Sequence, residues 1–209
     1  MFSDFKGSTF ESSFHIILDS STRGDSGDLA IECRVAGPWL LNVESWLVQM
    51  RDSRELNKKM YFSRFPPSID SLTAYLDKGP IKDPNQILFL IVDGLGALYG
   101  QVGLKVDHTG VVHLDNILRL ADGSPGIIRT ALQKVLTWGN KSLGIPEFGL
   151  RVISTNLRAI ALYQELGFSL QERKNLRIET LPNHSTNLVP SAKENSNTTE
   201  ELLLMKIKF

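Results

Sequence analysis

The sequence contains one cysteine, Cys33, in 209 residues, so the chain cannot form an internal disulfide. Disulfides are rare in reducing compartments, and we therefore expect a cytoplasmic protein. The first residues lack the basic start and apolar stretch of a secretory signal. No apolar run approaches the ~20 residues that a membrane-spanning helix needs, so we expect no membrane partner.

An excess of charge of either sign is also missing. Lys plus Arg and Asp plus Glu number 23 each, which leaves a formal net charge of zero. Surfaces that coat nucleic acids need clustered positive charge, so we expect no nucleic-acid partner. A local basic pocket for a phosphate-rich ligand is compatible with this balance. The four histidines, at positions 15, 108, 113 and 184, are scattered and show no ligand spacing, so we expect no metal site.

Alternating apolar and polar residues, separated by turn signals, make up most of the chain. We expect a loose polar arm over residues 1–12 and a single domain over residues 13–209. The patterns predict strands at 14–19, 29–35, 87–92, 102–106, 111–118, 148–153, 168–178 and 205–209. They predict helices at 42–50, 68–76, 125–143 and 156–166. The Pro- and Asn-rich stretch 181–198 is expected to be a polar insertion without regular structure.

The order of these elements predicts the fold class. Three consecutive strands in the middle of the chain favour antiparallel pairing, whereas the later strand–helix–strand units favour parallel crossovers. We therefore expect an α/β fold with a mixed, mostly antiparallel sheet and helices on both faces.

The most informative segment is NLRAIALYQELGF at residues 156–168. The spacing i, i+3, i+4, i+7 places an amide, two apolar residues and a phenol on one helix face, from Asn156, Ala159, Ile160 and Tyr163. Asn156 is also a good helix cap. The alternative is an ordinary amphipathic helix with a capping asparagine and a core tyrosine.

This segment resembles the N-x-x-A-x-x-L-Y-x-x-x-G-F element of the GCN5-related N-acetyltransferase (GNAT) superfamily, and the resemblance extends over most of the chain. It implies a GNAT-like fold and acetyl-CoA as the acyl donor. By position, Asn156, Ala159 and Ile160 would contact the pantetheine arm of the donor. The hydroxyl of Tyr163 would lie near the thioester sulfur and act as the acid for the leaving thiolate.

A second segment, NILRLADGSPGII at residues 116–128, resembles the strand and pyrophosphate loop of the same family. Main-chain N–H groups at a helix N-terminus bind phosphate oxygens, and glycine permits close approach. The predicted contacts are Arg119, Gly123, Ser124, Gly126 and Ile127. Pro125 lacks an N–H and Ile128 replaces an expected glycine, so a plain strand–turn–helix junction is the alternative.

The strand before this loop should separate from its parallel neighbour at 148–153 and expose unpaired main-chain groups. The resemblance implies that the pantetheine amides pair there, along Asn116, Ile117 and Leu118, with a main-chain N–H polarising the thioester carbonyl. The alternative is normal strand pairing.

The base that removes the amine proton is expected on the same strand. His113 and Asp115 share one face with Ile117 at a period of two, and Asp115 is preferred. A structural role for each is the alternative.

The acceptor is predicted from WLVQMRD at residues 46–52 followed by MYF at residues 60–62, which resembles the opening of the branch that acylates amino sugars and protein N-termini. The resemblance implies that this region forms the acceptor wall, and the alternative is two amphipathic helices that pack on the sheet. An amine on a nucleotide-linked sugar is the first choice, and a protein N-terminus or another small-molecule amine is the second. A non-catalytic acyl-CoA-binding module is the alternative of another class. A homodimer is compatible with the sequence.

Overall fold

The computed structural model describes residues 1–18, 31–121, 125–182 and 185–209. The described strands form one sheet of ten, in the order β1-β2-β4-β5-β6-β7-β10-β8-β9-β3. Their bounds are β1 His15–Leu18, β2 Ile31–Val35, β3 Ser63–Arg64, β4 Gln86–Val92, β5 Leu98–Val106, β6 Val112–Arg119, β7 Glu147–Ile153, β8 Ser169–Thr180, β9 Thr186–Pro190 and β10 Glu201–Lys208. Only the β6–β7 pair among them is parallel, so the predicted α/β class is confirmed.

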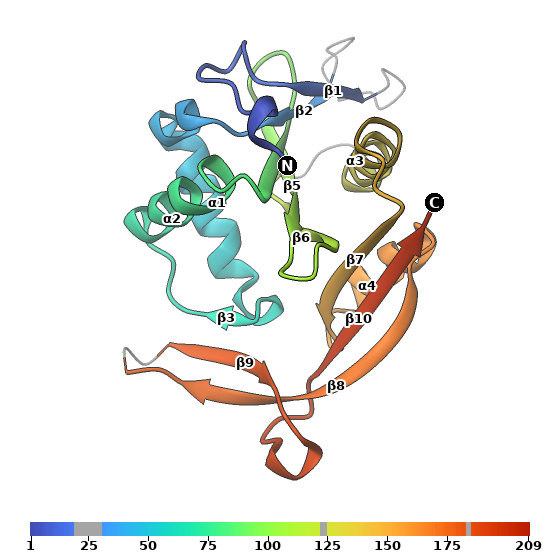
Figure 1. Ribbon diagram of the computed structural model, residues 1–209. Coiled ribbons are helices and arrows are strands. Elements are labelled where there is room, and N and C mark those ends of the chain that lie inside the picture. Colours follow the sequence, from blue (N-terminus) through green and yellow to red (C-terminus); the bar gives the residue numbers. More distant parts are fainter. Residues whose placement is uncertain (19–30, 122–124, 183–184) are drawn as a thin grey trace.

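Helices cover both faces of this sheet (Figure 1). Their bounds are α1 Glu44–Leu56, α2 Ile69–Leu76, α3 Ile127–Leu143 and α4 Leu157–Glu165. Short helical turns lie at Ser3–Phe5, Pro38–Asn42, Lys58–Met60, Asp77–Ile81 and Lys193–Asn195.

The continuous apolar run of β4 explains why the sheet is covered on two sides. Ile87 and Phe89 belong to one core cluster, which contains the buried side of α3 and Tyr163 of α4. Leu88 and Leu90 belong to a second cluster on the other face, together with the buried side of α1 and α2. A strand that is buried on both faces has no polar alternation, as observed.

The helix ends follow from local residue types. Ser68 and Ser71 form a reciprocal capping box at the start of α2. Helix α2 ends at Leu76, as predicted, and the chain continues into the π-helical turn Asp77–Ile81. Helix α3 begins at Ile127, two residues later than predicted, after Gly126 in the left-handed conformation (φ 86°).

The N-terminal segment 1–12 differs from the expected loose arm, because it is packed against the domain. Phe2 is fully buried in the first core cluster, and its N–H donates to the Pro84 carbonyl at 2.8 Å. The ring of Phe5 contacts Phe14 and Trp138, each at 5.1 Å between centroids. Burying a phenylalanine side chain contributes about 1.5–3 kcal/mol, which outweighs the polar composition of the segment.

The stretch 181–198 also differs from its prediction. It contains strand β9, which pairs with β8 on one side and with β3 on the other. Leu188 of β9 is 4% exposed and packs with Leu176 and Leu202 in a third, smaller core cluster. The insertion is therefore a β-ribbon that extends the sheet past β8 (Figure 1).

Candidate active site

The sheet opens between β6 and β7. The two strands pair at only three positions, of which Leu114 with Leu150 is the last. Beyond this pair, β6 is bonded to β5 alone and β7 to β10 alone. Figure 1 shows the strands diverging from this point. The predicted separation of these two strands is confirmed.

A β-bulge lies on β6 at the start of the opening. Asn116 has φ 49°, the one positive value outside glycine among the described residues. Asparagine tolerates this conformation better than most residues. The register with β5 shifts here, and the Asn116 carbonyl accepts a hydrogen bond from Gln101 Nε2 at 3.1 Å. Because of the bulge, side chains of β6 after Asn116 point to the opposite faces of the sheet from those that strict alternation would give.

The bulge shows that the prediction of one shared face for His113, Asp115 and Ile117 was wrong. His113 and Asp115 do share a face, but Ile117 does not lie on it. Ile117 packs against the first core cluster, with Leu114 and Val112. A period of two fails after a bulge, because the extra residue turns the following side chains to the other face.

A cavity of about 1350 Å³ passes through the opening. It is lined on one face of the sheet by the start of α3 and by α4, and on the other face by the end of α1 and by β10. Pockets for one small ligand commonly measure ~300–1,000 Å³, so this cavity is large enough for two substrates that meet in the sheet.

Most of the predicted site residues line this cavity. They are His113, Asp115, Asn116, Ile117, Leu118, Arg119, Gly126, Ile127, Asn156, Ala159 and Tyr163. Ile160 is not among the lining residues and instead packs against the first core cluster. Gly123 and Ser124 lie outside the described residues.

Tyr163 of α4 lies at the edge between core and cavity. It is 7% exposed, and its ring packs edge-on against Phe168 at 6.1 Å. Burial raises the pKa of Tyr163 above its ordinary value, and the charge of Asp115 raises it further. The phenol is therefore protonated at neutral pH and can donate a hydrogen bond into the cavity.

Asp115 lies where the cavity passes from one face of the sheet to the other. Its charge contributes to the raised pKa of Tyr163 on α4 and of Tyr61 and Tyr75 on the opposite side, after burial as the larger cause. For Tyr75 the pKa reaches about 12. One carboxylate thus influences phenols on both sides of the opening.

The side chain of Asn116 holds this carboxylate. Its Nδ2 donates to Asp115 Oδ2 at 3.1 Å and also to the hydroxyl of Tyr75. Asn116 was predicted only as a main-chain contact for the donor. The bulge turns its amide toward Asp115, a role that the spacing of the sequence did not indicate.

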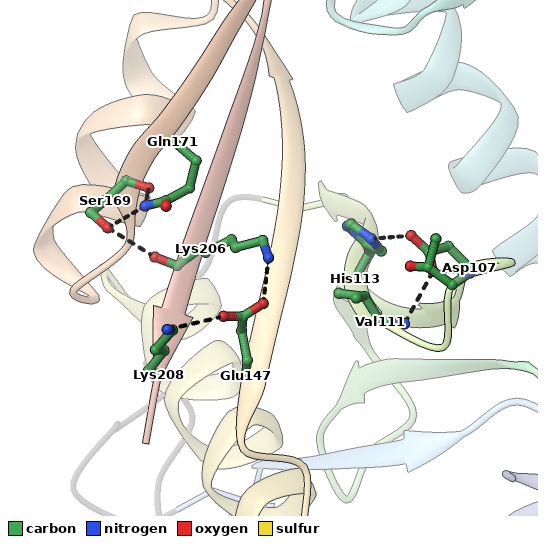
Figure 2. A network of polar contacts seen from close by, with 9 residues as sticks. Asp107, Val111, His113, Glu147, Ser169, Gln171, Lys206 and Lys208 are labelled. Atoms are coloured by element: carbon green, nitrogen blue, oxygen red, sulfur yellow. Dashed lines mark hydrogen bonds and ion pairs between the residues drawn. The ribbon is translucent and has the colours of Figure 1, made fainter.

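His113 is held in a different way (Figure 2). Its Nε2 lies 2.9 Å from Asp107 Oδ2. The other oxygen of Asp107 accepts hydrogen bonds from the N–H and hydroxyl of Thr109 and from the Val111 N–H. The Nδ1 atom of His113 is buried without a partner in the described structure, against Gly149. Both ring nitrogens are thus turned away from an incoming amine.

The start of α3 is the basic end of the cavity. Gly126 and Ile127 line it, so the first free N–H groups of the helix lie at this end. Arg129, in the first turn of α3, lines the cavity, as do Arg119 at the end of β6 and Arg158 in the first turn of α4. Arg129 also pairs with Glu165 of α4. The helix dipole and these cations together suit a phosphate-rich ligand.

Several lining residues were missed from the sequence, namely Arg129, Arg151, Arg158 and Lys174. Arg129 and Arg158 each lie in the first turn of a helix that follows a turn segment, and this position could have identified them. Lys174 reaches the cavity from a segment distant in sequence, and no local pattern marks it. Tyr61, from the segment that was expected to form the acceptor wall, does line the cavity.

Other chemistries find no support in the described residues. Cys33 is fully buried, and burial raises the pKa of its thiol, so the reactive thiolate is disfavoured. Within the described ranges no three His, Cys, Asp or Glu side chains gather as metal ligands, and no helix is both long and apolar enough to cross a membrane.

Trp46, the first residue of the segment from which the acceptor was predicted, is a core residue. It is 9% exposed, and its indole N–H donates to the Gly96 carbonyl.

Comparison with known proteins places this geometry in a family. The model of the acetyltransferase (GNAT) family matches residues 50–168, which include the opening, the bulge and α4. No curated protein sequence matches the chain.

Solved structures share the fold. Spermidine N-acetyltransferase from Vibrio cholerae, in complex with CoA and spermine, is similar with a TM-score of 0.60 and 19% identity, covering 85% of this chain and 95% of that one. Mutant forms of the spermidine/spermine N-acetyltransferase from the same bacterium give a TM-score of 0.58 at 18% identity, covering 85% and 93%. These identities show the fold alone, whereas the family model spans more than half of the sequence. The chain belongs to the acetyltransferase (GNAT) family.

Proposed function

We propose that the protein transfers an acetyl group from acetyl-CoA to a primary amine of a small molecule, by direct attack in a ternary complex. The observation that carries this proposal is the cavity that crosses the sheet beside Asp115 and Tyr163. A donor can enter it from the α3 and α4 face and an acceptor from the α1 and α2 face. Holding the two reactants together can supply effective molarities of ~10⁵ M or more.

The residues present fit an acyl-CoA donor, which this family uses. The diphosphate would lie at Gly126 and Ile127, because the first free main-chain N–H groups of α3 line the cavity there; Arg119 and Arg158 line the same cavity and add positive charge. The pantetheine amides would pair with the edge of β6 from Asp115 to Arg119, which has no ladder partner on the β7 side. When bound, the donor supplies an activated acetyl thioester.

Asp115 is the proposed base. The amine nitrogen forms a bond to the thioester carbonyl carbon, the carbon–sulfur bond breaks, and the nitrogen loses one proton. Asp115 lines the cavity and is oriented by Asn116, so it can take that proton directly or through a water molecule. His113 is less suited, because Asp107 engages one ring nitrogen and Gly149 covers the other.

Tyr163 is the proposed hydrogen-bond donor to the leaving sulfur. A thiol has a pKa of about 8.5 and an ordinary phenol one of about 10, so full proton transfer to the thiolate would be uphill by about 2 kcal/mol. Because burial raises the pKa of Tyr163, the phenol keeps its proton and stabilises the thiolate by donating a hydrogen bond. A main-chain N–H near Ile117 or Leu118 would polarise the thioester carbonyl.

An amine on a nucleotide-linked sugar remains the first proposal for the acceptor, and a protein N-terminus the second. The names of the structural neighbours suggest a polyamine as a third candidate. Among the residues that the structure describes, six lysine and arginine side chains line the cavity against three carboxylates, which disfavours a polycation.

The test is release of CoA thiol from acetyl-CoA with a panel of acceptors: aminodeoxy sugar nucleotides, peptides with a free N-terminus, and spermidine. We expect turnover with at least one sugar amine. Asp115→Asn should lower kcat at least tenfold, whereas Asp70→Asn, an exposed control on α2, should not change it. Tight CoA binding without turnover of any amine would instead favour a non-catalytic acyl-CoA-binding module.

A further inference from the structure

Arg151 stands on β7 at the first position after the pairing with β6 ends. Its neighbours Leu150 and Val152 are buried in the first core cluster, on the face that α3 and α4 cover. Because side chains alternate along a strand, Arg151 points to the opposite face, from which the acceptor enters. It is exposed and lines the cavity.

The guanidinium of Arg151 has no hydrogen bond or ion pair within the part of the chain that the structure describes. The guanidinium lies 6.0 Å from the centre of the Phe62 ring, which is at the limit of a cation–π interaction. Other arginines of this chain do have carboxylate partners: Arg34, Arg51, Arg64, Arg129, Arg173 and Arg177. Arg151 therefore keeps its donors available for a ligand.

The wall beside Arg151 is apolar and ends in a second cation. Leu202 and Leu204 of β10 line the cavity and, with Phe62, belong to the third core cluster. Lys174 of β8 lies opposite Leu202 in the register and lines the cavity as well, and its Nζ is 3.3 Å from a carboxylate oxygen of Glu172, which does not line the cavity. A ligand on this wall meets positive charge along one side.

The described lining residues leave one carboxylate available to attract a cation. Among the described lining carboxylates, Glu165 pairs with Arg129 and Asp107 is held in its turn by Thr109. Asp115 is left to attract the ammonium of the acceptor. One ammonium group of an acceptor can therefore be paired with Asp115 on this side of the cavity. A second ammonium group of the same acceptor would face Arg151.

We infer that Arg151 forms an anion subsite of the acceptor cavity, so that the acceptor amine also carries a carboxylate or a phosphate group. This inference rests on the proposed function, because it assigns Asp115 to the amine. An arginine fork suits both anions, since each offers two oxygens in one plane. The amine would lie at Asp115 and the anion at Arg151.

The test compares matched acceptors in the presence of acetyl-CoA. Glucosamine 6-phosphate is compared with glucosamine, and alanine with alaninamide, so that the two arms separate phosphate from carboxylate. We expect kcat/KM to be at least tenfold higher for the anionic member of one pair. Arg151→Gln should bring that ratio close to one through a higher KM, and Arg151→Lys should retain part of it.

Arg173→Gln is the matched control, because Arg173 is an exposed strand arginine that pairs with Glu201 and does not line the cavity. It should keep the parent ratio. Equal kcat/KM for both members of each pair, with ready turnover of the neutral amines, would overturn the subsite and leave the proposed function standing.

Binding gives a readout that does not depend on turnover. Calorimetry with the CoA-loaded protein should show that glucosamine 6-phosphate or alanine binds the parent at least tenfold more tightly than Arg151→Gln. If no amine is acetylated but this difference is found, the proposed function fails and the subsite holds. If the parent and Arg151→Gln bind the anionic amines equally, the subsite is refuted.

Discussion

Replacing Tyr163 by phenylalanine removes one hydroxyl from the wall of the cavity and leaves the buried ring in place. The ring is 7% exposed and packs against Phe168, so its apolar contacts persist in the variant. The hydroxyl has no hydrogen-bond partner within the described residues, and its loss leaves no group unpaired. We therefore expect the free energy of unfolding to change by less than about 0.5 kcal/mol.

The effect on rate should be much larger, because the hydroxyl is needed when charge develops on sulfur. A hydrogen bond to a charged group contributes about 1.5–3 kcal/mol. Loss of this stabilisation in the transition state lowers kcat by about 10- to 150-fold. The neutral thioester sulfur is a weak acceptor, so the Kd of acetyl-CoA should change by less than about threefold.

The assay combines two measurements on Tyr163→Phe. Thiol release at saturating acetyl-CoA and amine gives kcat, and calorimetry gives the Kd of acetyl-CoA. Tyr99→Phe is the control, since the Tyr99 hydroxyl donates to Asp93 and the residue does not line the cavity. It should leave kcat unchanged.

Two results would refute the reasoning. An unchanged kcat for Tyr163→Phe would remove the phenol from the mechanism. A Kd that rises as much as kcat falls would show that Tyr163 binds the donor in its ground state and does not act on the leaving group.

Three further predictions concern stability. Gly149→Ala should destabilise the fold by about 1–3 kcal/mol, because an added Cβ would lie 2.7 Å from the His113 ring; an unchanged Tm in thermal unfolding would contradict the packing described. Leu188→Ala should destabilise by about 2–5 kcal/mol if β9 is a packed strand, and urea unfolding with no loss would indicate a loose loop instead. The pKa of Asp107 is lowered, first by the Thr109 side chain, so its contribution to stability is present above the ordinary aspartate pKa and is lost as the pH falls toward the lower folded value. Unfolding scans from neutral to acidic pH should therefore show a shallower acid loss for Asp107→Asn than for the parent.

The α4 segment shows how much a local pattern can determine. The helix, its asparagine cap and the position of its tyrosine were predicted from residues 156–168, and the structure has each of them. These features depend on contacts within a few residues, and so the sequence encodes them directly.

The N-terminal segment shows where local composition fails. Residues 1–12 are polar on average, yet Phe2 and Phe5 find partners in the core that come from Phe14, Trp138 and Pro84. The β9 strand was missed for the same reason, since its pairing with β3 joins residues far apart in the chain. Burial by distant partners overrides the composition of a short segment.

The sequence by itself determined the mixed sheet and the position of Tyr163 on its helix, because periodicity and capping act over a few residues. The tertiary structure decided three matters: the bulge at Asn116, the turning of His113 toward Asp107, and the placing of Arg151 opposite Asp115 across the opening. The first two depend on the register between β5 and β6, and the third depends on the register between β6 and β7. Strand register is set by the whole packed sheet, and no single segment carries it.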